Sequence, residues 1–354
     1  MTQEIDKSDA AKASSANARI NIPLNLENWK RLPDAQQSLL IWFHQHMLNG
    51  NLGYQEAQDA IGYDNSTIFR VLKGTYSGSW DNVCKAIESY KNIVSERGSI
   101  IQAETVDNSI AKLIYGGLDY ARANNSITTI IGESRMGKTV AALKWQEENN
   151  HGTSVYVVAP PIGGVCFFLR RIASAVGVNK NQAMDQMSES IYRAFNKNRI
   201  LIVDEAHRLL PGDSRTNPQK LEMLRDIRDM TGCALALIAT QRFDDMLSKS
   251  AYMYEQILGR IGMPVRLKRE IPLDDILPIV KQYVRSPSKE MRDECKRIAN
   301  EMGRLGILVE TLKVASRISS KRKEKLSEEH FWAALKLRTQ MMGEILYAKK
   351  GRKA

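Results

Sequence analysis

The sequence predicts an α/β protein with a parallel five-stranded sheet between two helical regions, and two observations support this. Residues 106–270 alternate short β-branched runs with helical patterns, as the strands and crossover helices of a parallel sheet do. Residues 36–95 and 272–346 show helical patterns and no strand-like run. We expect a disordered tail, a small all-α helix-turn-helix domain, an α/β core and an all-α lid with a basic tail at residues 1–30, 31–95, 96–270 and 271–354. The strands are expected at residues 127–131, 155–159, 200–203, 234–239 and 263–267.

The composition predicts a cytoplasmic protein with no membrane partner. The hydrophobic fraction of 43% is ordinary for a chain with a sizeable core. The N-terminus carries acidic residues and no early apolar run, which argues against a signal peptide. The most apolar stretch, residues 155–169, is broken by prolines and glycines into pieces too short to span a bilayer. The four cysteines lack metal-ligand spacing and are interpreted as reduced thiols.

Positive charge is concentrated in the C-terminal third of the chain. The segment from Arg260 onward carries 23 Lys/Arg against 12 Asp/Glu, which accounts for the whole net charge of +11. The preceding residues are therefore neutral in sum. A basic region of this kind favours a polyanionic partner such as nucleic acid, and a solvated basic surface is the alternative.

Residues 132–139 read Gly-Glu-Ser-Arg-Met-Gly-Lys-Thr, the G-x-x-x-x-G-K-[ST] pattern of a phosphate-binding loop. A β-branched run precedes the loop and a helical pattern follows it, so bound phosphates would lie at a helix N-terminus. Lys138 is expected to neutralise the β- and γ-phosphates, and the Thr139 hydroxyl to ligate Mg²⁺. The expected nucleotide-binding set comprises Gly132, Glu133, Ser134, Arg135, Met136, Gly137, Lys138, Thr139 and Val140, together with Asp204.

Two carboxylates follow the buried strand at residues 200–203, and both point to chemistry rather than packing. Asp204 is expected to be a second Mg²⁺ ligand, and Glu205 to polarise the attacking water as a catalytic residue. His207 completes an Asp-Glu-Ala-His string that also occurs in a helicase superfamily. Because too little chain remains for the second α/β domain of such a helicase, we interpret His207 as a packing residue near the site.

Polar residues follow the next apolar strand as well. The carboxyl ends of parallel strands share one edge of a sheet, so Thr240, with Gln241 in reserve, is expected to bind the γ-phosphate or the attacking water. An ordinary helix cap is the alternative. Arg260 precedes the last strand and is the expected cation for transition-state charge in the site of a neighbouring copy. A surface ion pair is the alternative for Arg260.

Residues 54–72 are interpreted as two short helices joined by a tight turn at Gly62, with Asn65 or Ser66 capping the second helix. The segment resembles DNA-binding helix-turn-helix modules, although Gln58 stands where such modules usually have alanine. A protein-docking domain with the same packing is the alternative. The apolar side is expected to comprise Ile61, Ile68, Val71 and Leu72. The side able to meet phosphates or base edges is expected to present Asn65, Thr67, Phe69, Arg70 and Lys73.

The order of phosphate loop, Asp-Glu strand, polar strand end, arginine and helical lid resembles that of the AAA+ ATPases. The resemblance implies that ATP and Mg²⁺ are bound and that ATP is hydrolysed to ADP and phosphate. In this family a lid arginine commonly touches the γ-phosphate. The matching position here is Gly306, so the contact is expected to be absent and hydrolysis slow, unless Arg304 substitutes.

From about residue 50 to 345, the layout is similar to that of the Mu B-type transposition ATPases, a group that includes the TnsC and IstB regulators. The similarity is specific at residues 132–139 and 200–205 and architectural elsewhere; residues 61–78 are similar in kind to the amino-terminal domain of the group. The resemblance implies a homo-oligomer, a filament or ring on duplex DNA of any sequence. It also implies that the protein selects the transposition target and activates a partner transposase.

Further basic residues on the core and the lid are candidates for contact with DNA, and each could equally be a solvated charge. They are Lys180, Lys220, Arg225, Arg322 and Lys323. Two other functions stay open. A helicase-loader or origin-type AAA+ ATPase would recruit a helicase in place of a transposase. A helix-turn-helix transcriptional regulator with an ATPase switch would leave a sequence-specific footprint and form a discrete oligomer.

Overall fold

The computed structural model describes residues 24, 26–50, 52–98, 101, 103–210, 218–249, 254–255, 258–301 and 304–347. The chain divides into two compact units, Met1–Ile100 and Ile101–Ala354, and each is described by itself. Residues 1–23 of the expected disordered tail and the lysines and arginines near the C-terminus lie outside the described residues. One part of the expected tail is corrected: Leu26–Trp29 forms helix α2, and Trp29 is fully buried.

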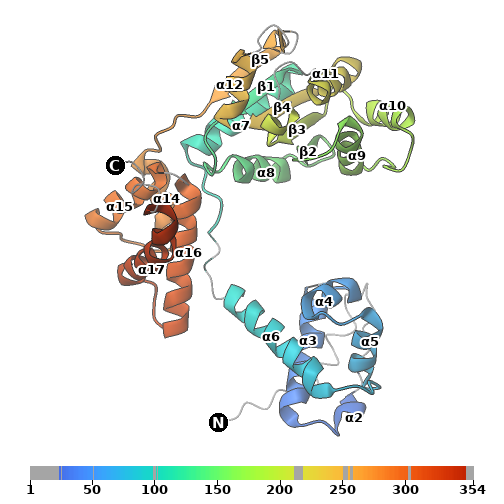
Figure 1. The fold of residues 1–354 in the computed structure, drawn as a ribbon, viewed down its shortest axis with the longest axis vertical. Coiled ribbons are helices and arrows are strands. Elements are labelled where there is room, and N and C mark those ends of the chain that lie inside the picture. The colour runs from blue at the N-terminus through green and yellow to red at the C-terminus, as the bar shows by residue number, and fades with distance from the viewer. Residues whose placement is uncertain are drawn as a thin grey trace. The chain divides into compact units, whose positions relative to one another are not determined.

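In its described residues, the first unit contains helices and no strand, as expected (Figure 1). The indole N–H of Trp29 donates a hydrogen bond to the carbonyl oxygen of Val71 at 3.0 Å, which ties α2 to the helix formed by residues 65–73. Gly62 joins the two central helices with φ of 72°, a left-handed conformation that glycine adopts without strain. After α2 the helices are α3 (Asp34–Asn49), α4 (Tyr54–Ile61), α5 (Asn65–Lys73) and α6 (Trp80–Gly98).

The cap of α5 differs from the prediction. Asp64, rather than Asn65 or Ser66, is the N-cap, and its carboxylate accepts from the Thr67 backbone N–H at 2.9 Å. The hydroxyl groups of Ser66 and Thr67 donate to the same carboxylate, at 2.6 and 2.7 Å. The expected exposure of Thr67 is therefore wrong, since its side chain turns back toward Asp64 and is buried. Ala57 of α4 is a small residue buried in the apolar cluster of this unit.

Five parallel strands form one sheet in the order β2-β3-β4-β1-β5, which confirms the predicted fold class. The three central strands are buried along their whole length, as in a sheet covered on both faces. Because the strands run in one direction, the residues that follow β1, β3 and β4 lie at the same edge. The strands are β1 (Ile127–Ile131), β2 (Ser154–Val158), β3 (Ile200–Asp204), β4 (Ala234–Ala239) and β5 (Ile261–Arg266).

Helices cover both faces of the sheet (Figure 1). One apolar cluster joins alternate strand residues such as Ile202 to α7 and α8, and the other joins residues such as Leu201 to the remaining core helices. This alternation follows from the two-residue period of a strand. The core helices are α7 (Ser109–Asn124), α8 (Lys138–Glu148), α9 (Val165–Ala175), α10 (Met184–Ala194), the short 3₁₀ helix η1 (Ala206–Leu209), α11 (Gln219–Thr231) and α12 (Gln241–Lys249).

The lid is helical and shares the apolar cluster of α7 and α8, so the core and the lid form one unit. Lid side chains also hold the segment that leads into α7. The Ser316 hydroxyl accepts from the Ile101 N–H at 3.0 Å, and the Gln282 side chain exchanges two hydrogen bonds with the backbone of Glu104. No helix in the described parts of the chain is long and apolar enough to cross a membrane. The lid helices are α14 (Leu273–Lys281), α15 (Lys289–Asn300), α16 (Arg304–Arg322) and α17 (Glu328–Tyr347).

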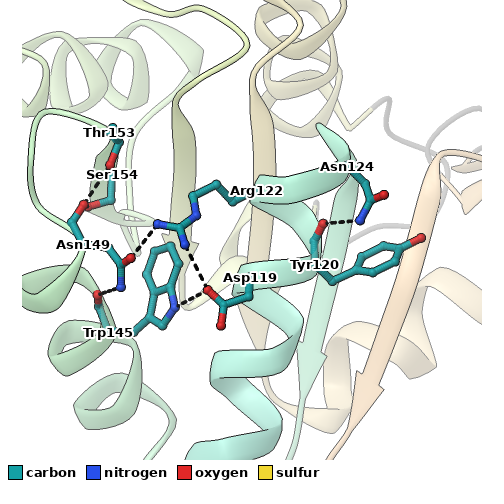
Figure 2. A network of polar contacts seen from close by, with 8 residues as sticks. All are labelled: Asp119, Tyr120, Arg122, Asn124, Trp145, Asn149, Thr153 and Ser154. Atoms are coloured by element: carbon teal, nitrogen blue, oxygen red, sulfur yellow. Dashed lines mark hydrogen bonds and ion pairs between the residues drawn. The ribbon is translucent and has the colours of Figure 1, made fainter.

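A polar network fixes the far end of α8, the helix that begins at the phosphate loop (Figure 2). Arg122 of α7 lies over the Trp145 ring, 5.0 Å from its centroid, and donates to the side-chain oxygen of Asn149 at 2.5 Å. Asp119 accepts from both Arg122 and the Trp145 indole, at 3.3 and 3.0 Å. The Asn149 carbonyl accepts from the Thr153 hydroxyl at 2.8 Å. The network therefore joins α7, α8 and the segment entering β2.

Candidate active site

The phosphate loop turns from β1 into α8. Gly137 has φ of 90°, which favours glycine, and directs the chain into the helix. Lys138 is the first residue of α8, and its ammonium group donates to the carbonyl oxygens of Gly132 and Glu133, at 2.9 and 2.7 Å. Burial lowers the pKa of Lys138, and the nearby carboxylates oppose this shift. The loop thus holds a buried cation at a helix N-terminus, where backbone N–H groups also favour an anion.

The structure brings the phosphate loop and the acidic strand end together at Asp204. The Thr139 hydroxyl donates to Asp204 Oδ2 at 2.6 Å, although the two residues are 65 positions apart. The Glu205 backbone N–H donates to Oδ1 at 2.7 Å, and the hydroxyl of Tyr156 on β2 donates to Oδ2 at 2.7 Å. A hydroxyl and a carboxylate in contact are hard oxygen donors, which Mg²⁺ prefers. The residues present therefore fit Mg²⁺, with Thr139 and Asp204 as the side chains that would hold it.

Glu205 begins the turn after β3 with φ of 56°, in the left-handed region. Its carboxylate lies 3.6 Å from the Arg208 guanidinium and 3.4 Å from His207 Nδ1. Burial lowers the pKa of His207 from 6.5, so the ring is neutral at neutral pH and Arg208 is the charged partner. His207 thus packs beside the acidic pair.

Thr240 follows β4, which lies between β1 and β3 in the sheet. The strand order therefore places it between the phosphate loop and the acidic pair, and it is half-buried. Its carbonyl accepts from the Phe243 N–H at 2.9 Å, so its backbone also begins α12. Gln241, the first residue of α12, is exposed at the same edge. Three neighbouring strands therefore deliver the expected phosphate-binding and catalytic groups to one place.

Arg260 lies at the end of the sheet where the strands begin, whereas the phosphate loop lies where they end. It precedes β5, whose first residue pairs with Ile127 at the start of β1, whereas the phosphate loop follows the end of β1. A strand of this length spans roughly 16 Å, further than an arginine side chain reaches. The Arg260 guanidinium lies 3.3 Å from Asp229. Arg260 is thus too far from the phosphate loop of its own chain to contact a nucleotide there.

The lid touches the phosphate loop at the start of α16. The Gly306 N–H donates to the carbonyl oxygen of Arg135 at 3.3 Å, and a Cβ at Gly306 would lie 3.0 Å from the Arg135 side chain. Arg304 is only 5% exposed and donates to the Arg269 carbonyl at 2.6 Å. Its guanidinium lies 3.8 Å from the Glu133 carboxylate. Arg304, and not position 306, therefore supplies the lid arginine beside the loop.

The other predicted residues differ in exposure. In the expected nucleotide-binding set, Met136 belongs to the core, whereas Ser134, Arg135 and Val140 are exposed. Arg225 is half-buried and paired with Glu222 at 2.7 Å, and Lys220 is also half-buried. The candidates for contact with DNA that are exposed are Asn65, Arg70, Lys73, Lys180, Arg322 and Lys323.

Sequence reasoning missed Tyr156, which contacts Asp204 from the neighbouring strand. The residue lies in an apolar strand, where tyrosine is ordinary, and its partner is 48 positions away. The sequence offered one clue to this contact: β3, which pairs with the strand that holds Tyr156, ends at Asp204. It also missed Arg208, because a basic residue after an acidic strand end is indistinguishable from a surface charge.

A phosphate loop between strand and helix, an Asp-Glu pair on a neighbouring parallel strand and a helical lid define a P-loop ATPase. Residues 121–247 match the family model described as an AAA domain. These residues are therefore an AAA domain, and the protein is an ATPase.

Two curated relatives extend beyond the AAA domain. The ATP-dependent target DNA activator B of Escherichia phage Mu is 22% identical over 285 residues, which cover 78% of this chain and 86% of that protein. The Mu-like prophage FluMu DNA transposition protein B of Haemophilus influenzae is 22% identical over 287 residues, or 78% and 96% of the two chains. The predicted resemblance to Mu B-type ATPases is confirmed. Among solved structures, the ORC2 protein of Aeropyrum pernix has a TM-score of 0.49 at 16% identity, covering 67% of this chain and 69% of that chain.

Proposed function

We propose that the protein is an ATP-dependent activator of transposition targets that acts in the cytoplasm. It oligomerises on duplex DNA as a filament or ring, selects the target and activates a partner transposase. The observation that carries this proposal is the alignment with target DNA activator B over 78% of the chain, because it extends far outside residues 121–247 of the AAA domain.

At the active site, ATP is the substrate. Water attacks the γ-phosphorus, the bond to the β-phosphate oxygen breaks, and ADP and phosphate leave. Lys138 binds the β- and γ-phosphates, Glu205 accepts the proton of the attacking water, and Thr240, with Gln241 in reserve, orients that water. Mg²⁺, held by Thr139 and Asp204, would supply neutralisation of phosphate charge.

The position of Arg260 supports an active site completed by a second copy of the chain. Arg260 is out of reach of the phosphate loop of its own chain, so a role in hydrolysis would require the nucleotide of a neighbouring copy. In the proposed oligomer, Arg260 leaves Asp229 and stabilises transition-state charge on the neighbouring nucleotide. ATP then holds two copies together, and hydrolysis removes the γ-phosphate on which both depend.

Oligomerisation also explains how weak DNA contacts could suffice. Single exposed cations such as Arg322 or Lys180 contribute little by themselves, but a polymer repeats each contact along the duplex. Binding of this kind is independent of sequence and falls steeply with salt. In the first unit, Asn65, Arg70 and Lys73 form an exposed polar and basic side of α5 that suits either DNA or the transposase.

The test is electron microscopy of the full chain with random-sequence duplex DNA and a slowly hydrolysed ATP analogue. We expect regular polymers with the analogue and none with ADP. Lys138→Ala should abolish them through loss of nucleotide binding. Arg260→Ala should bind the nucleotide yet lose polymers and hydrolysis, whereas Arg297→Ala, which removes an exposed lid cation, should resemble the unaltered protein. Equal DNA binding without nucleotide would contradict the proposal, and single particles at one sequence would favour a transcriptional regulator.

A further inference from the structure

The hydroxyl of Tyr156 reaches the acidic strand end across the sheet. β2 and β3 pair in parallel, with Tyr156 opposite Ile202 and Val158 opposite Asp204. Residues two apart on a strand share a face, so Tyr156 and Asp204 are diagonal neighbours on the face that α8 covers. The hydroxyl therefore approaches Asp204 from the side of the sheet, within the layer where α8 begins at the phosphate loop.

Tyr156 and Thr139 converge on one oxygen of Asp204. Both hydroxyl groups donate to Oδ2, at 2.7 and 2.6 Å, while the Glu205 N–H donates to Oδ1. The Glu205 N–H holds Oδ1, and the two hydroxyl groups, from α8 and β2, hold Oδ2. Together these contacts resist rotation of the Asp204 carboxylate. One of these, Thr139, is itself an expected ligand of the cation.

The hydroxyl of Tyr156 is a permanent donor. Its O–H donates to Asp204 Oδ2 at 2.7 Å, and an ionised carboxylate can only accept. A phenylalanine would fill the same half-buried space without the donor. Nothing in packing alone requires the hydroxyl, because the ring already contacts the apolar cluster on this face.

We propose that Tyr156 is a positioning residue for the cation of MgATP. It holds the Asp204 carboxylate against the Thr139 hydroxyl, so that the two oxygens are presented to the cation together. The inference rests on the proposed assignment of Thr139 and Asp204 as ligands. Partners of this kind orient metal ligands without touching the metal, and their loss weakens metal affinity by about 10- to 100-fold.

The test is a titration of the full chain with MgCl₂ at a fixed concentration of a fluorescent, slowly hydrolysed ATP analogue, followed by nucleotide fluorescence. The same binding is measured in EDTA. Tyr156→Phe should raise the Mg²⁺ concentration for half-saturation about 10- to 100-fold. Binding in EDTA should stay within about twofold of the unaltered protein, because the phosphate contacts of Lys138 do not involve Tyr156. Tyr192→Phe is the matched control, since it removes a tyrosine–aspartate hydrogen bond on the opposite helix layer.

Two results would overturn the inference. Tyr156→Phe could show the same Mg²⁺ dependence as Tyr192→Phe. It could lose binding equally in Mg²⁺ and in EDTA, which would indicate a structural role; circular dichroism of the variant identifies misfolding directly. Thr139→Ala separates this failure from failure of the ligand assignment: if it too leaves the Mg²⁺ dependence unchanged, the ligands themselves are wrong.

Discussion

The contact between Asp275 and Ser109 offers a quantitative test of how the lid is held. Asp275 of α14 is 5% exposed, and its carboxylate accepts from the Ser109 backbone N–H at 2.8 Å and from the Ser109 hydroxyl at 2.5 Å. Ser109 is the first residue of α7, so its N–H has no partner within that helix. The lid carboxylate thus caps a core helix. Asp275→Ala removes both contacts at once.

The cost can be worked from the two hydrogen bonds. Hydrogen bonds to a charged group contribute about 1.5 to 3 kcal/mol each. Because Ser109 is exposed, water replaces part of the loss, and the lower end of the range applies. We therefore expect Asp275→Ala to lower the free energy of unfolding of the second unit by about 3 kcal/mol. Ser109→Ala removes only the hydroxyl contact and should cost about 1 to 1.5 kcal/mol.

The assay is urea unfolding of the full chain, followed by circular dichroism and tryptophan fluorescence. The transition of the second unit should shift to lower urea and that of the first unit should not, because the contact lies within Ile101–Ala354. In the double variant, the Ser109→Ala change should add little to Asp275→Ala, since the pair is one interaction. A loss for Asp275→Ala no larger than that for Ser109→Ala would refute the capping argument.

Three further predictions concern the loop, the first unit and the network of Figure 2. Lys138→Ala should reduce ATP affinity below detection by calorimetry, because it removes the buried cation of the loop. Hydrogen bonds from Ser66 and Thr67 lower the pKa of Asp64 below 3.8, so its contribution to stability is present above that pH and is lost on acidification below it. Thermal melting of the first unit should show this decline, and Asp64→Asn should flatten it. Arg122→Ala should cost about 1 to 2 kcal/mol in urea unfolding of the second unit. Arg297→Ala, which removes exposed ion pairs with Glu294 and Glu301, should cost less than about 1 kcal/mol.

Strand positions followed from the sequence where burial is uniform. β1 and β4 are buried throughout and are followed by Gly132 and Thr240, and their predicted bounds are those of the structure. β5 begins two residues before its predicted start, because it is an edge strand whose side chains are mostly exposed and carry no apolar pattern. The predicted cap of α5 was wrong for a related reason. Asp64, Asn65 and Ser66 can each cap a helix, and only the folded geometry shows that Asp64 does so.

The sequence predicted those active-site residues that belong to a recognisable motif with a known role. Lys138, Thr139 and Asp204 lie together as their motifs indicate, because the sheet topology forces the ends of β1 and β3 to one edge. The supporting contacts were not predictable. Tyr156 meets Asp204, and Arg304 meets Glu133, only through pairings that the folded chain creates between distant segments. The spacing of residues along the chain does not predict such contacts.

These supporting contacts change how nucleotide binding should be understood. Lys138 already bonds two loop carbonyls, Arg304 lies beside Glu133, and Glu205 lies beside Arg208. A polyphosphate that binds these side chains must therefore replace their existing partners. Its binding free energy is the difference between the free energy of the new contacts and that of the contacts that are lost. If the nucleotide displaces Glu133 from Arg304, it changes a contact between the lid and the loop. We therefore expect nucleotide binding to be coupled to the position of the lid.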